Sequence, residues 1–181
     1  MARLLDDLPY LDRPEVLSFP QGSVTVRPYQ IVVWASVQLF GQYSSPVSAP
    51  VFPVILDTGN SYTFSIGENH LRRWAGIARS SLPLLGSLFA NRQPVERRAA
   101  TLWLHRNRRG ERRLPALDAP YRLEIQNGLA VYPGSIPSPR LPLLGLRVLD
   151  ENGLYLSLDS ERRCVHLNTS GWRVRLLRWL S

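Results

Sequence analysis

Residues 53–61 read Pro53-Val54-Ile55-Leu56-Asp57-Thr58-Gly59-Asn60-Ser61, an apolar run followed by polar and small residues. The apolar run is typical of a strand and ends abruptly at Asp57. A lone carboxylate is unfavourable to bury unless it is paired or hydrogen-bonded. An apolar strand that ends on an acid, followed by a hydroxyl residue and a glycine, therefore predicts a functional carboxylate. Asp-Thr-Gly also favours turns, so a plain turn after a strand is the alternative interpretation.

The segments on both sides of this stretch are dense in β-branched and aromatic residues, which favour strands. We expect strands at 24–26, 31–40, 62–66, 100–105, 121–125, 129–132, 154–158 and 164–167. A short helix is expected from Glu68, because Leu71, Trp74 and Ala75 share one face and Gly76 can end it. Residues 146–149 form a second short amphipathic stretch. The sequence thus predicts a mainly β domain, barrel-like or sandwich-like, with one or two short helices.

The composition excludes several classes of protein. The chain has 181 residues, of which 44% are hydrophobic, so it can bury one good core and is too apolar to be intrinsically disordered. Its 15 prolines argue against a long helical bundle. The formal net charge is +8, and every basic residue is an arginine. Coding bias toward arginine is the preferred explanation, and recognition of phosphates or carboxylates by guanidinium groups is the alternative. Charge alone does not choose a partner.

No metal site, cofactor or membrane span is predicted. Cys164 is the single cysteine, which rules out an internal disulfide and a cysteine-rich zinc site, and the three histidines show no metal-ligand spacing. Asp6, Asp7 and Asp12 lie where a secretory signal would need an apolar core. The longest apolar stretch, residues 31–40, is too short to span a bilayer. We therefore expect a cytoplasmic protein with no integral membrane segment.

Two motifs and their order carry a family resemblance. The Asp57-Thr58-Gly59 segment resembles the active-site loop of retropepsin-like aspartic proteases, which are single-domain enzymes of the retroviral type that also occur in bacteria. Leu143-Leu144-Gly145, followed by a short helix, resembles the strand that supports this loop in the family. The resemblance covers roughly residues 24–168. It implies a closed, barrel-like acid-protease domain.

The resemblance also implies a reaction. Family members are endopeptidases that hydrolyse peptide bonds in peptide or protein substrates, using a water activated by two facing aspartates that share one proton. This chain holds one such motif, so the active form would be a homodimer in which each copy donates Asp57. Thr58 would then brace the two loops, and Gly59 would let the backbone turn tightly. Asn60 and Ser61 complete the loop. Asn60 departs from the family, which usually has alanine or serine there.

The family's flap, a hairpin that closes over substrate, has no clear signature in this sequence. We place it at residues 84–97, with Leu85, Gly86 and Ser87 near the tip. The charged turn Asn107 to Gly110 is the rival position. Around the expected retropepsin-like domain of residues 23–169 lie an extended N-terminal arm, 1–22, and a C-terminal segment, 170–181. The resemblance gives that segment a role in forming the dimer.

Two other functions remain open at this level. A non-catalytic module of the same fold could bind a peptide or partner, as Asn60 and the ill-defined flap suggest. Clusters of arginine at 97–98 and 106–113 could contact phosphates, but Trp103 is the only aromatic residue near them, whereas β-type nucleic-acid binders interleave several. We therefore expect no nucleic-acid partner.

Overall fold

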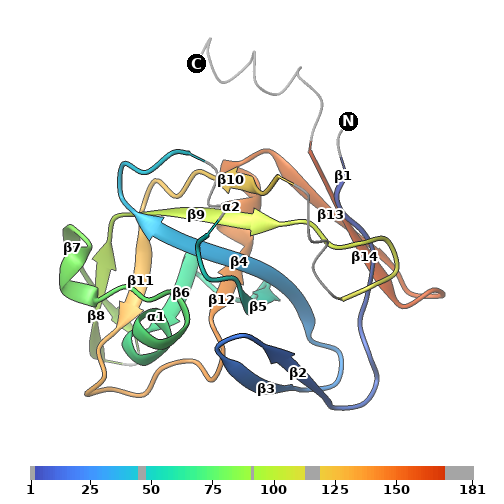
Figure 1. Cartoon of the computed structure of the whole chain (residues 1–181), viewed down its shortest axis with the longest axis horizontal. Coiled ribbons are helices and arrows are strands. Elements are labelled where there is room, and N and C mark those ends of the chain that lie inside the picture. Colours follow the sequence, from blue (N-terminus) through green and yellow to red (C-terminus); the bar gives the residue numbers. More distant parts are fainter. Residues whose placement is uncertain (1–2, 45–47, 91, 113–118, 170–181) are drawn as a thin grey trace, which may run out of the picture.

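A computed structural model describes residues 3–44, 48–90, 92–112 and 119–169. These residues are mainly β, with two α-helices and one 3-10 turn, as the sequence predicted (Figure 1). In chain order the elements are β1 (Arg3–Pro9), β2 (Glu15–Phe19), β3 (Gly22–Val26), β4 (Ile31–Leu39), β5 (Phe52–Asp57), β6 (Phe64–Gly67), α1 (Glu68–Trp74), η1 (Arg79–Ser81), β7 (Leu84–Ala90), β8 (Gln93–Arg98), β9 (Ala100–His105), β10 (Tyr121–Leu123), β11 (Leu129–Tyr132), β12 (Leu143–Gly145), α2 (Leu146–Glu151), β13 (Leu154–Asp159) and β14 (Cys164–Thr169). No helix in these ranges has the length and apolar character needed to cross a membrane.

The strands form one large sheet and two small ones. The large sheet has nine strands in the order β10-β9-β4-β5-β12-β6-β11-β8-β7, the second sheet is β1-β14-β13, and β2 pairs with β3. The two outer strands of the large sheet, β10 and β7, do not pair with each other, so the described strands form no closed barrel. Our prediction of a closed barrel is wrong in this respect, because closure depends on pairing between distant edge strands, which short strands and turn residues do not reveal.

The core explains why β5 is apolar throughout. This strand lies in the interior of the large sheet, antiparallel to β4 and parallel to β12, and Phe52 to Leu56 are all buried. Strands covered on both faces read as continuous apolar runs rather than as an alternation. Helix α1 packs Leu71 and Trp74 into the same core, and Gly76 follows it with a φ of 70°. The predicted helix and its glycine stop are confirmed.

The N-terminal segment belongs to the folded domain. Strand β1 pairs antiparallel with β14 and buries Leu4, Leu5 and Leu8, while β2 forms a hairpin with β3. The expected arm is therefore extended in conformation but is packed into two sheets. The expected dimer-forming segment at 170–181 lies outside the described residues.

A partly buried histidine makes stability depend on pH. His105 ends β9, where its Nε2 lies 2.8 Å from Oγ of the buried Ser36. Burial lowers the pKa of His105 to about 4, from 6.5 in the unfolded chain. Between these values the unfolded chain binds the additional proton, so the folded state loses stability as the pH falls from about 6.5 to about 4.

We predict that His105→Gln weakens this pH dependence. The free energy of unfolding, measured by urea titration at several pH values, should fall less steeply with decreasing pH in the variant. The difference in slope is expected to reach at most about 1.4 kcal/mol per pH unit, which corresponds to one proton. Identical slopes for the wild type and the variant between pH 6.5 and 4 would show that His105 is not the group that titrates.

Candidate functional site

The structure brings the two predicted motifs together, although they are far apart in the sequence. Strand β12, which is the predicted supporting segment Leu143, Leu144 and Gly145, lies between β5 and β6 in the large sheet. It runs parallel to β5 with Gly145 opposite Asp57, and antiparallel to β6 (Figure 1). Asp57 is the last residue of β5 and is half-buried. The structure thus places the two motifs side by side in the large sheet.

Gly145 is required by the path of the acidic loop. A Cβ atom at this position would lie 1.9 Å from the carbonyl oxygen of Tyr62 and 2.8 Å from that of Asn60. The backbone N–H of Gly145 donates to the carbonyl oxygen of Thr63 at 3.0 Å. The loop after Asp57 therefore passes directly over β12, at a separation that no side chain can occupy.

We predict that Gly145→Ala strongly destabilises the protein. The added methyl group would meet backbone atoms, which can move away only if the Asp57 loop shifts. The free energy of unfolding should fall by about 3 kcal/mol or more, at the upper end of the range for overpacking.

Chemical denaturation of the wild type and the variant measures this difference. Gly134→Ala is a suitable control, because the nearest atom to a Cβ there is a Glu68 side-chain oxygen at 3.5 Å, which is an ordinary contact. A loss no larger in Gly145→Ala than in this control would contradict the close packing.

The loop is a tight turn that orients the carboxylate of Asp57. Its Oδ1 accepts a hydrogen bond from the N–H of Gly59 at 2.9 Å, and its backbone carbonyl accepts one from the N–H of Asn60 at 3.1 Å. Thr58 and Gly59 are exposed at the tip. A plain turn would make the same two bonds. The Asp57 loop differs from a plain turn because it also packs closely on Gly145.

Asn60 braces the loop from inside. Its Nδ2 donates to Oγ of Ser65 at 3.2 Å, and its Oδ1 accepts from the N–H of Tyr62 at 3.3 Å. Ser65 lies in β6 and is completely buried. Asn60 stands where the resemblance leads us to expect alanine or serine. Its side chain connects the acidic loop to the neighbouring strand β6.

We predict that Asn60 and Ser65 are energetically coupled. Asn60→Ala should lower the free energy of unfolding by about 1–2 kcal/mol, because it leaves the hydroxyl of Ser65 buried without this partner. A double-mutant cycle with Ser65→Ala should give a coupling of about 1 kcal/mol. Strictly additive losses would show that the two side chains do not interact.

The predicted flap segment forms a hairpin, but its tip lies elsewhere than expected. Strands β7 and β8 pair from Leu84 and Arg98 to Ala90 and Gln93, so the turn follows Ala90. Leu85, Gly86 and Ser87 lie within β7, near its start, and our placement of them at the tip is wrong. Glycine at position 86 signalled a turn in the sequence, whereas in the structure it faces Arg97 across the hairpin.

The hairpin is tied to the acidic loop. The hydroxyl of Tyr62 donates to the carbonyl oxygen of Phe89 at 3.2 Å. The rival position for the flap, Asn107 to Gly110, lies in the connection between the antiparallel strands β9 and β10. Asn107 is buried and donates through Nδ2 to the carbonyl oxygen of Asp6.

Two hollows differ in their relation to Asp57. The larger, of about 990 Å³, lies beside β2 and is lined by Phe19, Trp34 and Arg112, among others, and by no residue of the Asp57 loop. The smaller, of about 220 Å³, is lined by Ser61, Tyr62 and Thr63 just after that loop. Arg97 of β8 and Arg147 of α2 also line it. Sequence patterns gave no sign of this second pocket, because its residues come from five separate segments.

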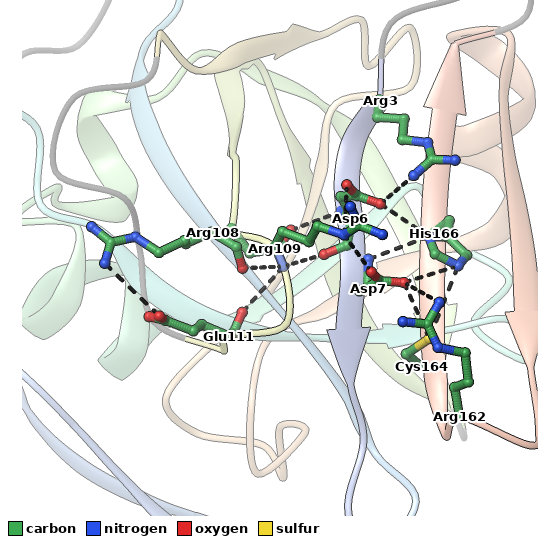
Figure 2. Close-up of polar contacts among 10 residues, drawn as sticks. Arg3, Asp6, Asp7, Arg108, Arg109, Glu111, Arg162, Cys164 and His166 are labelled. Atoms are coloured by element: carbon green, nitrogen blue, oxygen red, sulfur yellow. Dashed lines mark hydrogen bonds and ion pairs between the residues drawn. The ribbon is translucent and has the colours of Figure 1, made fainter.

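One cluster of possible metal ligands lies away from Asp57. Donor atoms of Asp7, Cys164 and His166 lie within 4.8 Å of one another. However, Arg109 and Arg162 already bind the carboxylate of Asp7, at 2.6 Å and 3.2 Å (Figure 2). Burial, together with nearby carboxylates, raises the pKa of the Cys164 thiol. Two guanidinium groups and a protonated thiol oppose a bound cation, so these contacts describe an ion-pair network.

This network holds β1 in place. Figure 2 shows Asp7 of β1 facing His166 and Cys164 of β14, with Arg109 and Arg162 on either side of its carboxylate. The two arginines keep the pKa of Asp7 below its usual value. Some of the chain's arginines, here Arg109 and Arg162, therefore have a structural role.

Comparisons with known proteins add no relative: no protein-family model matches the chain, and the searches of curated proteins and of solved structures give no match.

Proposed function

We propose that the chain is a retropepsin-like aspartic endopeptidase that acts as a homodimer, with Asp57 of each copy forming the catalytic pair. The observation that carries the proposal is the position of Asp57 at the end of a buried strand, opposite Gly145, in a loop that packs on β12. A turn without a function would not need a buried glycine in a distant strand to make room for it. The structure thus supports the motif that the sequence analysis singled out.

A second copy is needed for the chemistry. Two carboxylates that face each other at short range cannot both ionise, so the pair holds one proton. The ionised carboxylate takes a proton from a water molecule, which attacks the peptide carbonyl carbon, and the protonated carboxylate donates a hydrogen bond to the carbonyl oxygen. The tetrahedral intermediate then breaks its C–N bond as the nitrogen accepts a proton. The exposed tip, Thr58 and Gly59, leaves the loop accessible to its counterpart.

The β7–β8 hairpin is the proposed cover for a bound peptide. It is tied to the loop through Tyr62 and Phe89, and it carries large apolar side chains that are exposed, namely Leu84, Leu85 and Phe89. A bound peptide would give these side chains a partner and would exclude water from the reacting groups. A cytoplasmic location remains the expectation.

The charges do not favour a nucleic-acid site. Glu96 binds both Arg79 and Arg98, at 2.6 Å each, and Glu15 binds Arg112 at 2.5 Å. The network around Asp7 engages Arg109 and Arg162. Guanidinium groups held by carboxylates of the same chain are not available for a row of phosphates.

We predict that Asp57→Asn abolishes peptide cleavage and leaves the fold intact. The full-length protein is incubated with a proteome-derived peptide library at pH 4–7, and new termini are identified by mass spectrometry. Asparagine cannot share the proton of the pair, so cleavage should fall by at least about a thousandfold. Thermal unfolding and light scattering check that the variant remains folded and dimeric.

Asp159→Asn is the matched control, because Asp159 is also the last residue of a strand, β13, and accepts a hydrogen bond from the N–H of Arg162. It should cleave as the wild type does. Cleavage that survives Asp57→Asn would refute the proposal. A folded chain that binds peptides but cleaves none would identify the non-catalytic binding module instead.

A further inference from the structure

The small pocket beside the Asp57 loop carries a positive charge that no carboxylate among the described residues balances. Arg97 and Arg147 both line it, and no Asp or Glu does. Among the described residues, neither arginine forms an ion pair, and Glu96, which precedes Arg97 in β8, is engaged by Arg79 and Arg98. What sets these two arginines apart is that they line one pocket together.

Arg97 is held in a defined position. It lies opposite Gly86 in the β7–β8 hairpin, and a Cβ atom on Gly86 would lie 3.2 Å from Nη2 of Arg97. The absence of a side chain at Gly86 thus leaves room for the guanidinium group. Nη1 of Arg97 makes one long hydrogen bond, at 3.5 Å, to Oδ1 of Asn127.

Arg97 also keeps an unused donor. Its Nε is buried and has no hydrogen-bond partner. A buried donor without a partner is unfavourable by about 1–3 kcal/mol, so the described residues leave this guanidinium group incompletely hydrogen-bonded. Guanidinium groups match carboxylates in both charge and planar geometry.

Arg147 connects the pocket to the proposed catalytic centre. It is exposed in α2, two residues after Gly145, which lies opposite Asp57. Ser61 and Tyr62, which also line the pocket, follow shortly after Asp57 in the chain. A peptide that passes Asp57 beneath the β7–β8 hairpin can therefore place one of its groups between the two arginines.

We propose that this pocket binds a carboxylate of the peptide substrate, so that the enzyme prefers an acidic residue near the cleaved bond. The carboxylate comes from a Glu or Asp side chain or from the C-terminus of the peptide. Arg97 and Arg147 are then specificity-determining residues. The inference rests on the proposed function, since it assumes that a peptide substrate binds at Asp57.

The first arm of the test measures cleavage. The full-length protein is offered the peptide library, and Glu or Asp should be enriched at one position within four residues of the cleaved bond. For a cleaved sequence, peptides with Glu and with Gln at that position are compared, each as a free acid and as a C-terminal amide. If the side chain is the ligand, the Glu to Gln ratio of kcat/KM should be about tenfold or more and independent of the amide. If the C-terminus is the ligand, amidation lowers kcat/KM instead.

Variants show whether the two arginines cause the preference. Arg97→Met and Arg147→Met keep the aliphatic stem and remove the charge, so each should reduce the preference for the carboxylate, measured as the Glu to Gln ratio of kcat/KM, at least threefold. Arg147 is exposed, so its variant is expected to fold even if the Arg97 variant does not. Arg72→Met, an exposed arginine of α1 that does not line the pocket, should leave this ratio unchanged.

The second arm separates this inference from the proposed function. Binding to the Asp57→Asn protein is measured by fluorescence anisotropy, with two pools of labelled degenerate octapeptides that carry either Glu or Gln at the fifth position, as free acids and as amides. A preference for the carboxylate that Arg97→Met or Arg147→Met removes supports the pocket even if the wild type cleaves nothing. Equal binding of all pools, or cleavage without any acidic preference, overturns the pocket and leaves the protease proposal standing.

Discussion

The contact between Gly145 and the loop above it is the constraint on which the rest of the site depends. The carbonyl oxygens of Asn60 and Tyr62 lie where a Cβ of residue 145 would be, so the loop and β12 are packed backbone against backbone. This packing sets the distance between the loop and β12, and therefore holds Asp57 in position at the end of β5. The side chain of Asn60 adds a polar link to Ser65 in β6, so the loop is held from two neighbouring strands.

The insertion of β12 between β5 and β6 has a consequence for the sequence of each strand. All three are interior strands of the nine-stranded sheet, and their residues are almost all buried. An acidic side chain is tolerated there only where the strand ends and the backbone amide of Gly59 provides a hydrogen bond. The apolar run and the abrupt change at Asp57 are therefore two results of the same burial.

The arginine charge has two different uses in the structure. Around Asp7, Glu15 and Glu96 it joins elements that are distant in the sequence, including the attachment of β1 through Arg109 and Arg162. Beside the Asp57 loop, Arg97 and Arg147 have no such carboxylate among the described residues. The net charge of +8 does not distinguish arginines that form ion pairs from those that do not. It sums all charges, whereas an ion pair depends on where two side chains lie in the fold.

The sequence by itself determined the local elements of this protein: the apolar strand that ends at Asp57, the helix that Gly76 stops, the short strands and the glycine at 145. These follow from residue preferences and from the period of burial, which act over a few neighbours. Other features are visible only in the tertiary structure. Gly145 lies opposite Asp57, Asn60 binds Ser65, and the large sheet stays open. The β7–β8 hairpin turns after Ala90 and not at Gly86, and Arg97 and Arg147 line the same pocket. Each of these depends on contacts between residues that are well separated in the chain or on the register of paired strands, which local preferences do not specify.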